Sequence, residues 1–214
     1  MDVRRFLDEL PRLFDGFPEA EHPRDRRLAR VLEEVKGLAK ENNLALLNLA
    51  ASLLPDGESY VEIGTFRGTS LISAMLGNEG GEFIAIDDFS FRDGTREQLK
   101  ANLERFGLPE PAILEGDAFE LVRGGALDGR RAGVYYYDNG HEYEQQLEAL
   151  RMIEPFLAER ALVIVDDTDW DDVSRATRVW LDEQPRAELL LDIAGEDRGN
   201  PAWWQGMWAI GWTA

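Results

Sequence analysis

The sequence predicts an α/β protein built on a doubly wound, mostly parallel seven-stranded sheet with helices on both faces. Short apolar runs typical of strands alternate with stretches of helical periodicity, and such alternation indicates parallel strands joined by crossover helices. Two further apolar runs near the C-terminus are separated only by a polar connection, which predicts an antiparallel hairpin. A chain of 214 residues with 44% apolar side chains is expected to form a single domain, residues 1–214.

The N-terminal part of the chain is predicted to be helical. Apolar side chains recur at helical spacing from Leu28 to Leu47, and the pattern ends at the turn sequence Pro55-Asp56-Gly57. We expect two or three helices within residues 1–54. They would form a helical cap on a Rossmann-like core over residues 55–214, or the contact surface of a homodimer.

The strands of the core are predicted in order from the apolar runs that follow. Five of these runs alternate with helical stretches, at Tyr60–Ile63, Phe83–Ile86, Ala112–Leu114, Val134–Tyr137 and Leu162–Val165. The terminal hairpin is predicted from Glu188–Ile193 and Trp203–Trp212, with one strand antiparallel to the rest. The tryptophans of the last segment are expected to pack the sheet against helices, and Trp203 and Trp204 are alternative candidates for substrate contact.

Acidic residues dominate the charge of the chain. The 42 Asp and Glu against 23 Lys and Arg give a formal charge of -19, which repels phosphate backbones and anionic lipid headgroups. We therefore expect neither a nucleic-acid nor a membrane partner. Residues 1–20 lack the apolar core of a signal peptide, and the absence of cysteine excludes disulfides and thiolate metal sites. A soluble cytoplasmic protein is expected.

The loop after the first strand is the most informative segment. Ligands of open parallel sheets bind at the carboxyl ends of the strands, where the strand order reverses. Gly64 permits a tight turn there, and Gly68 lets the following helix, Thr69–Leu76, begin close to a ligand. An ordinary strand-to-helix turn is the alternative interpretation of the two glycines.

The ligand of this loop is predicted to carry an amino-acid group rather than a pyrophosphate. The spacing is Gly-x-x-x-Gly, whereas the dinucleotide fingerprint needs a third glycine. A carboxylate at Glu62 would repel phosphate and attract an ammonium group. Asp87 could accept hydrogen bonds from both ribose hydroxyls, unless it is a solvated strand end. Asp117 could receive the exocyclic amine of adenine, or it could simply cap the following helix.

From about Leu54 to the C-terminus, the chain resembles class I S-adenosylmethionine-dependent methyltransferases. Within that class, the segment from Glu62 to Ser70 is similar to the first motif of catechol-type, metal-dependent O-methyltransferases. The resemblance implies that S-adenosylmethionine (SAM) is the cofactor. It also implies that Glu62 meets the methionine ammonium, that Phe66 lies beside the cofactor and that Ser70 helps to hold the methionine carboxylate.

Carboxylates follow the fourth and fifth predicted strands, at Asp138 and at Asp166-Asp167. Neighbouring strands lie about 4.8 Å apart, so these side chains can share one hard cation and would repel one another without it. The metal-dependent family is similar here, which implies that Asp138, Asp166 and Asp167 bind Mg²⁺. Asp167 replaces the Asn of catechol enzymes and matches the Asp-Asp pair of macrolide-sugar O-methyltransferases. Capping of the next helix is the alternative role for such acids.

His141 is the predicted general base. It lies three residues after Asp138, the offset at which catechol-type enzymes carry a lysine base. A histidine titrates near neutral pH and can accept the proton of a hydroxyl whose pKa a metal lowers. Asp138 and His141 are thus the predicted catalytic residues, and a surface histidine in the first turn of a helix is the alternative.

The predicted function is transfer of the methyl group of SAM to a hydroxyl of a small-molecule acceptor, with the assistance of Mg²⁺. The N-terminal helices and the aromatic C-terminal segment are expected to form the acceptor pocket. Two other functions stay open. One is a metal-dependent glycosyltransferase that uses the string Asp167-Thr168-Asp169, and the other is a non-catalytic module that binds SAM without turnover.

Overall fold

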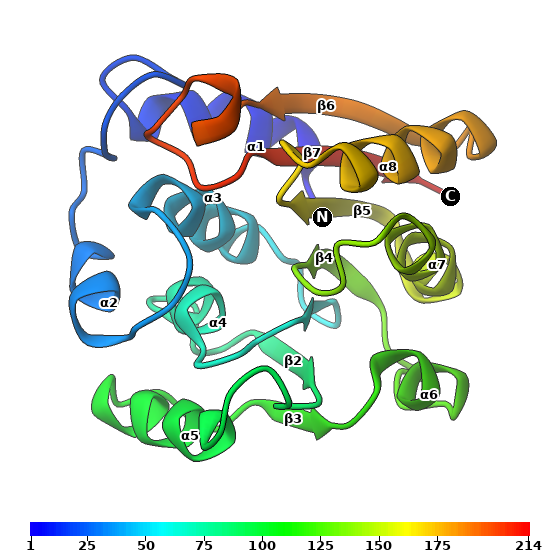
Figure 1. The fold of residues 1–214 in the computed structure, drawn as a ribbon, viewed down its shortest axis with the longest axis horizontal. Helices are drawn as coiled ribbons and strands as arrows, with labels where there is room; N and C mark the ends of the chain where they lie inside the picture. The colour runs from blue at the N-terminus through cyan, green and yellow to red at the C-terminus, as the bar shows by residue number, and fades with distance from the viewer.

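One seven-stranded sheet organises the molecule (Figure 1), as seen in a computed structural model that describes residues 1–214. The strand order is β3-β2-β1-β4-β5-β7-β6. All neighbouring strands are parallel except β7, which runs antiparallel to both β5 and β6. The predicted fold class is confirmed. The strands are β1 (Ser59–Ile63), β2 (Glu82–Asp87), β3 (Ala112–Glu115), β4 (Ala132–Tyr137), β5 (Leu157–Asp166), β6 (Ala187–Ile193) and β7 (Met207–Thr213).

Helices precede the sheet and connect most of its strands. The α-helices are α1 (Val3–Glu9), α2 (Ala29–Glu34), α3 (Glu41–Ser52), α4 (Thr69–Met75), α5 (Thr95–Arg105), α6 (Ala118–Arg123), α7 (Tyr143–Ile153) and α8 (Asp171–Glu183), and the short 3₁₀ segments are η1 (Leu10–Leu13), η2 (Glu154–Phe156) and η3 (Glu196–Arg198). Each predicted central strand is present. The largest difference is at β5, which begins at Leu157 rather than at Leu162.

Side chains of alternate strand residues enter two hydrophobic clusters, one on each face of the sheet. On β1, Tyr60 belongs to the cluster with α1, α3, α4 and α5, whereas Val61 and Ile63 belong to the cluster with α6, α7 and α8. This is the period of two that a strand imposes on its side chains. Glu62 therefore points to the same face as Tyr60, toward α3 and α4.

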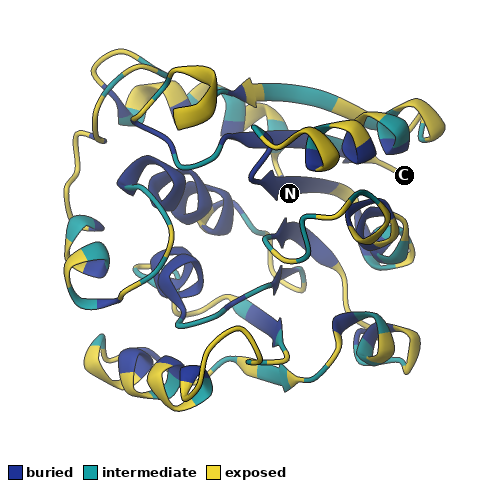
Figure 2. Ribbon diagram, in the orientation of Figure 1, coloured by how far each residue is buried: buried dark blue, intermediate teal, exposed yellow.

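The N-terminal helix α3 is part of the layer that covers this face. It packs against α4, and all of its residues except Ser52 are buried (Figure 2). The preceding helix α2 ends at Glu34, so that residues 35–40 form a loop and Leu38 is exposed. The helical spacing of apolar residues in the sequence includes Leu38, but in the structure Leu38 lies in the loop between α2 and α3 rather than on a helix.

The terminal hairpin is confirmed, although β7 begins at Met207 rather than at Trp203. Trp203 is fully buried, packs against the rings of Phe14 and Phe17, and donates a hydrogen bond from Nε1 to the carbonyl oxygen of Pro18 at 2.8 Å. This anchoring of the chain to the N-terminal segment leaves residues 203–206 in a loop. None of the helices combines the length and the apolar character that a membrane span requires.

The strand order places a crevice at the centre of the sheet. From β1 the chain continues outward to β2 and β3, and it then returns to add β4 on the other side of β1. The carboxyl ends of β1 and β4 are therefore the point at which the strand order reverses, where ligands of such sheets bind.

Candidate active site

A cavity of about 510 Å³ opens at the carboxyl ends of β1 and β4. Its walls come from the loops that follow β1, β2, β4 and β5, from α3 and the first turn of α4, and from the loops that precede α3 and β7. Seven of the predicted site residues line it, namely Gly64, Phe66, Ser70, Asp87, Asp138, His141 and Asp167. Glu62, Gly68, Asp117 and Asp166 do not line it, and their positions are described separately below.

The loop after β1 requires both of its glycines. Gly64 has a φ of +94°, and a Cβ there would collide with the carbonyl oxygen of Asp138. Gly68 has a φ of +87° and precedes α4, and a Cβ there would overlap the side chain of Leu99. Phe66 also adopts a left-handed backbone, with a φ of 51°, a conformation that is uncommon for a bulky residue and that clusters at functional sites.

Glu62 is fully buried directly beneath the cavity. Its carboxylate accepts hydrogen bonds of 2.9 Å from the hydroxyls of Ser70 and Tyr60, and Ser70 lines the cavity above it. Burial raises the pKa of Glu62 to about 8, even though both hydroxyls favour the ionised form. The predicted contact between Glu62 and an ammonium group stays a prediction, and the proton on this carboxyl is available for release.

Asp87 organises two loops at the cavity. Its oxygens accept hydrogen bonds of 2.6 Å from the backbone N–H groups of Phe66 and Phe89. Partial burial raises the pKa of Asp87, and the two amide donors oppose that shift. Asp87 is therefore not a freely solvated strand end. Each carboxylate oxygen has a second lone pair, which leaves room for a ligand hydroxyl.

Asp117 is exposed and lies outside the cavity lining. Its carboxylate accepts a hydrogen bond of 2.9 Å from the backbone N–H of Glu120, which makes it the N-cap of α6. Helix capping, one of the two roles considered from the sequence, is thus present in the structure. A contact between Asp117 and a cofactor stays a prediction.

Asp138, His141 and Asp167 form a compact cluster at the cavity. One potential ligand atom of each lies within 4.8 Å of the others. Nε2 of His141 is 2.6 Å from Oδ2 of Asp167 and 3.9 Å from Oδ1 of Asp138. Partial burial lowers the pKa of His141, but the two carboxylates outweigh this effect and raise it to about 10. In this arrangement the imidazole carries a proton at neutral pH and acts as an ion-pair partner.

Asp166 lies behind this cluster rather than in it. It is 4% exposed and accepts a hydrogen bond of 2.5 Å from the hydroxyl of Tyr136, which also lies 3.3 Å from Oδ2 of Asp138. Burial raises the pKa of Asp166 well above its usual range, and the charges of Asp138 and Asp167 act in the same direction. The structure thus brings together two of the three predicted metal ligands, with His141, and places the third beside them.

The residues present fit a hard divalent cation. Oδ1 of Asp166 and Oδ1 of Asp167 are buried and have no hydrogen-bond partner, a state that costs free energy unless a ligand supplies the missing interaction. Carboxylate oxygens are the ligands that Mg²⁺ prefers. Asp167 also has a φ of 54°, a strained backbone conformation of the kind that clusters at functional sites.

Asp169 has a structural role. Its buried carboxylate accepts hydrogen bonds of 3.1 Å from the backbone N–H groups of Gly195 and Arg198, and it forms an ion pair with the Arg198 guanidinium. These contacts tie the loop after β5 to the loop before β7. The string Asp167-Thr168-Asp169 therefore points its two acids at different partners, which disfavours its use as a metal and nucleotide-sugar site.

Sequence reasoning did not identify several polar residues of the cavity. Oγ1 of Thr69 and Nδ2 of Asn43 are buried without a hydrogen-bond partner, and both residues line the cavity. Unpartnered polar atoms at such a place indicate contacts left for a ligand. Thr69 lies inside the glycine loop motif and could have been selected on that ground. Asn43 lies on α3, far from any motif, and no local signal marks it.

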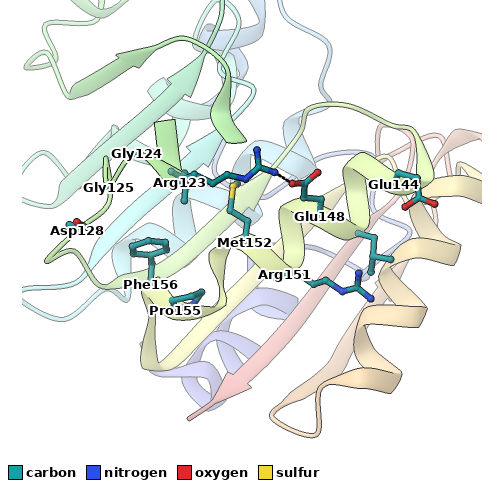
Figure 3. Close-up of a pocket in the computed structure, with 12 residues that line it drawn as sticks. Arg123, Gly124, Gly125, Asp128, Glu144, Glu148, Arg151, Met152, Pro155 and Phe156 are labelled. Carbon is teal, nitrogen blue, oxygen red and sulfur yellow. Dashed lines mark hydrogen bonds and ion pairs between the residues drawn. The ribbon is translucent and has the colours of Figure 1, made fainter. Parts of the chain in front are cut away.

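A second depression of about 820 Å³ lies between α6 and α7 (Figure 3). Arg123 forms an ion pair with Glu148 across it, above the apolar side chains of Met152 and Phe156. It contains none of the predicted site residues and none of the unpartnered buried polar atoms. The smaller cavity is therefore the candidate active site, although the second depression is larger.

A family model and a curated protein each match part of this chain. A family model described as "Methyltransferase domain" matches residues 61–168. A curated relative, the uncharacterized protein R132 of Acanthamoeba polyphaga mimivirus, is 26% identical over 126 residues. That alignment covers 57% of this chain and 57% of R132, so the chain spans little more than half the length of that relative.

Solved structures share the fold at low sequence identity. Cofactor-bound Rv0187 from MTB has a TM-score of 0.65 at 19% identity, over 99% of this chain and 96% of that one. The O-methyltransferase TomG of Streptomyces achromogenes, involved in tomaymycin synthesis and in complex with SAM, has a TM-score of 0.65 at 18% identity over 100% of both chains. An O-methyltransferase from Bacillus cereus in complex with SAH has a TM-score of 0.64 at 14% identity, over 89% and 92%.

Proposed function

The chain belongs to the family of methyltransferase domains, and from that premise we propose that it transfers the methyl group of SAM to a hydroxyl oxygen of a small-molecule acceptor. One observation carries the proposal. A single cavity at the strand-order reversal gathers the glycine loop after β1, Asp87 at the end of β2, and the acidic cluster after β4 and β5. The loop and Asp87 suit a nucleoside with an amino-acid tail, and the cluster suits a hydroxyl acceptor.

In this proposal the cofactor lies over the loop between β1 and α4. Asp87 receives the ribose hydroxyls, Ser70 and Glu62 hold the methionine group, and Phe66 lies against the cofactor. The hydrogen bond between Ser70 and Glu62 supports this arrangement, because it couples the cavity wall to a buried carboxylate that can compensate an ammonium. The SAM and SAH complexes of TomG and the Bacillus cereus enzyme support the same cofactor.

Methyl transfer is an in-line displacement at the sulfonium carbon. The acceptor oxygen forms a bond to the methyl carbon, the carbon–sulfur bond breaks with both electrons going to sulfur, and the hydroxyl proton is lost. The protein must hold oxygen, carbon and sulfur in line and receive that proton. We assign this role to Nε2 of His141, and its position in the lining beside Asp138 and Asp167 supports the assignment.

Mg²⁺ is the proposed cation, held by Asp138 and Asp167 with Asp166 as the third predicted ligand. When bound, such a cation lowers the pKa of a coordinated hydroxyl. The unpartnered oxygens of Asp166 and Asp167 support its presence. If Asp138 and Asp167 bound this cation, their charges would no longer raise the pKa of His141 as they do in the ligand-free ion pair.

Calorimetric titration with S-adenosylhomocysteine (SAH) tests the proposal. SAH is expected to bind to the purified protein, and a nucleotide sugar such as UDP-glucose is expected to give no binding heat in the presence of Mg²⁺. Binding of UDP-glucose without SAH binding would instead favour the glycosyltransferase. A protein that binds SAH but converts no acceptor in a broad panel of hydroxyl compounds with SAM and Mg²⁺ would be the non-catalytic module.

A further inference from the structure

Three large apolar side chains remain exposed in this chain, and all three surround one cavity. Leu38, Phe91 and Trp170 are 52%, 64% and 42% exposed, and each lines the candidate active site. They come from separate loops, before α3, after β2 and after β5. Single exposed apolar residues need no explanation, whereas a group of them at a cavity marks a surface that a ligand covers.

Trp170 lies on the acceptor side of the proposed site, and Phe91 lies on its cofactor side. Phe91 contacts the ring of Phe66 at 5.3 Å between centroids, so it belongs with the predicted cofactor position. Trp170 instead lies edge to face with His141 at 4.6 Å and donates a hydrogen bond of 3.2 Å to Oε1 of Gln205. A hydroxyl compound that reaches His141 must therefore lie close to the indole ring of Trp170.

The charges of the lining disfavour acceptors that carry an anionic group. Its acidic and basic side chains, apart from the Tyr136 hydroxyl, are four aspartates and His141, which lies 2.6 Å from Asp167, and neither arginine nor lysine is present among its residues. Among the cationic residues next to the lining in sequence, Lys40 forms an ion pair of 2.6 Å with Glu196 and Arg67 donates to the carbonyl oxygen of Lys36. Arg92 stacks over the ring of Phe91 at 5.2 Å, on the side of the predicted cofactor position. A carboxylate, sulfonate or phosphate on the acceptor would face a lining in which four aspartates outnumber the single His141.

We infer that the acceptor of the proposed methyl transfer is an apolar ring compound without an anionic group, and that Trp170 and Leu38 select it. The inference rests on the proposed function and names the substrate class of the same site. Apolar side chains would cover the ring, while the hydroxyl reaches the acidic cluster. Leu38 and Trp170 are specificity-determining residues in this arrangement, because they contact the acceptor body rather than the reacting atoms.

Calorimetry on the full-length protein separates this inference from the proposed function. SAH is titrated first, and the SAH-saturated protein is then titrated with a naphthalenediol that has adjacent hydroxyls and, separately, with the sulfonate of the same diol. The diol is expected to bind at least about tenfold more tightly than the sulfonate. Failure of SAH to bind removes the proposed function. Normal SAH binding with equal affinity for the two compounds, or with no diol binding, overturns this inference alone.

Two variants test the assigned residues. Trp170→Ala should weaken diol binding by about tenfold and leave SAH binding unchanged, whereas the control Phe119→Ala, a half-buried aromatic on α6 outside the cavity, should change neither. Leu38→Arg adds a permanent cation to the lining and should raise the affinity for the sulfonate relative to the diol by about tenfold. An unchanged diol affinity in Trp170→Ala, or an unchanged ratio in Leu38→Arg, overturns the assignment.

Discussion

Nε2 of His141 lies 2.6 Å from Oδ2 of Asp167, and the pair bridges the loops that follow β4 and β5. The two residues are distant in sequence, but β4 and β5 are adjacent parallel strands whose carboxyl ends meet at one edge of the sheet. The ion pair occupies the place where a cation and an acceptor hydroxyl are proposed to meet. The protonation state of His141 in this ion pair therefore bears directly on its proposed role as proton acceptor.

Replacement of His141 should affect turnover more than cofactor binding. His141→Gln removes the proposed proton acceptor, and a lost general base costs about a hundredfold or more in kcat. The affinity for SAH should stay within about twofold, because no contact links His141 to the predicted cofactor residues. Steady-state kinetics with the best acceptor of a panel and calorimetry with SAH measure the two effects. A wild-type kcat in His141→Gln would assign the proton to another acceptor.

Cofactor binding should release a proton near neutral pH. The pKa of Glu62 is about 8 in the ligand-free protein, so this carboxyl is mostly protonated at pH 7 and must ionise to meet an ammonium group. The affinity for SAH is expected to rise as the pH increases from 6 toward 8. Calorimetric titrations at pH 7 in phosphate and in Tris should give different heats, because the two buffers differ in ionisation enthalpy. Equal heats would contradict the role of Glu62.

The same group should make the ligand-free protein more stable at low pH. The folded-state pKa of Glu62 lies above its ordinary value of 4.5, so the folded state retains a proton that the unfolded chain gives up. The stabilising contribution is fully present below about pH 4.5 and is lost as the pH rises through about 8. In urea titrations, the free energy of unfolding of the wild type minus that of Glu62→Gln should fall as the pH rises from about 4.5 to about 8. A difference that rises with pH would contradict this expectation.

Removal of the Asp87 side chain should weaken SAH binding. Asp87→Ala deletes the predicted ribose acceptor and releases the N–H groups of Phe66 and Phe89, and the loss is expected to be about 1–3 kcal/mol. Asp93→Ala is a matched control because Asp93 is exposed in the following loop and does not line the cavity. Unchanged affinity in Asp87→Ala would place the ribose elsewhere.

The contact between Asp169 and Arg198 should contribute to the stability of the folded chain. Asp169→Asn leaves the Arg198 guanidinium without its buried partner and is expected to cost about 1–3 kcal/mol in the free energy of unfolding. Asp171→Asn, at a surface ion pair with Arg175, should cost less than about 1 kcal/mol. Urea denaturation compares the two. Equal small effects would show that the loop before β7 is held by other contacts.

Local sequence patterns predicted the strands, the hairpin, the glycine loop and the acids at the ends of β4 and β5. These features depend on the alternation of side chains along a strand and on the short-range geometry of turns, which neighbouring residues determine. The positive φ values of Gly64 and Gly68 belong to the same class, because a strand-to-helix turn of this spacing favours glycine at those points.

Only the tertiary structure decided which side chains share the cavity. Asn43 accepts a hydrogen bond from the backbone N–H of Trp204 across 161 positions of the chain, and no local pattern encodes such a contact. The same holds for Asp166 and Asp167, which are adjacent in sequence but point to Tyr136 and to His141. Long-range packing of loops and helices sets these directions, since it determines the partners and the burial of each side chain.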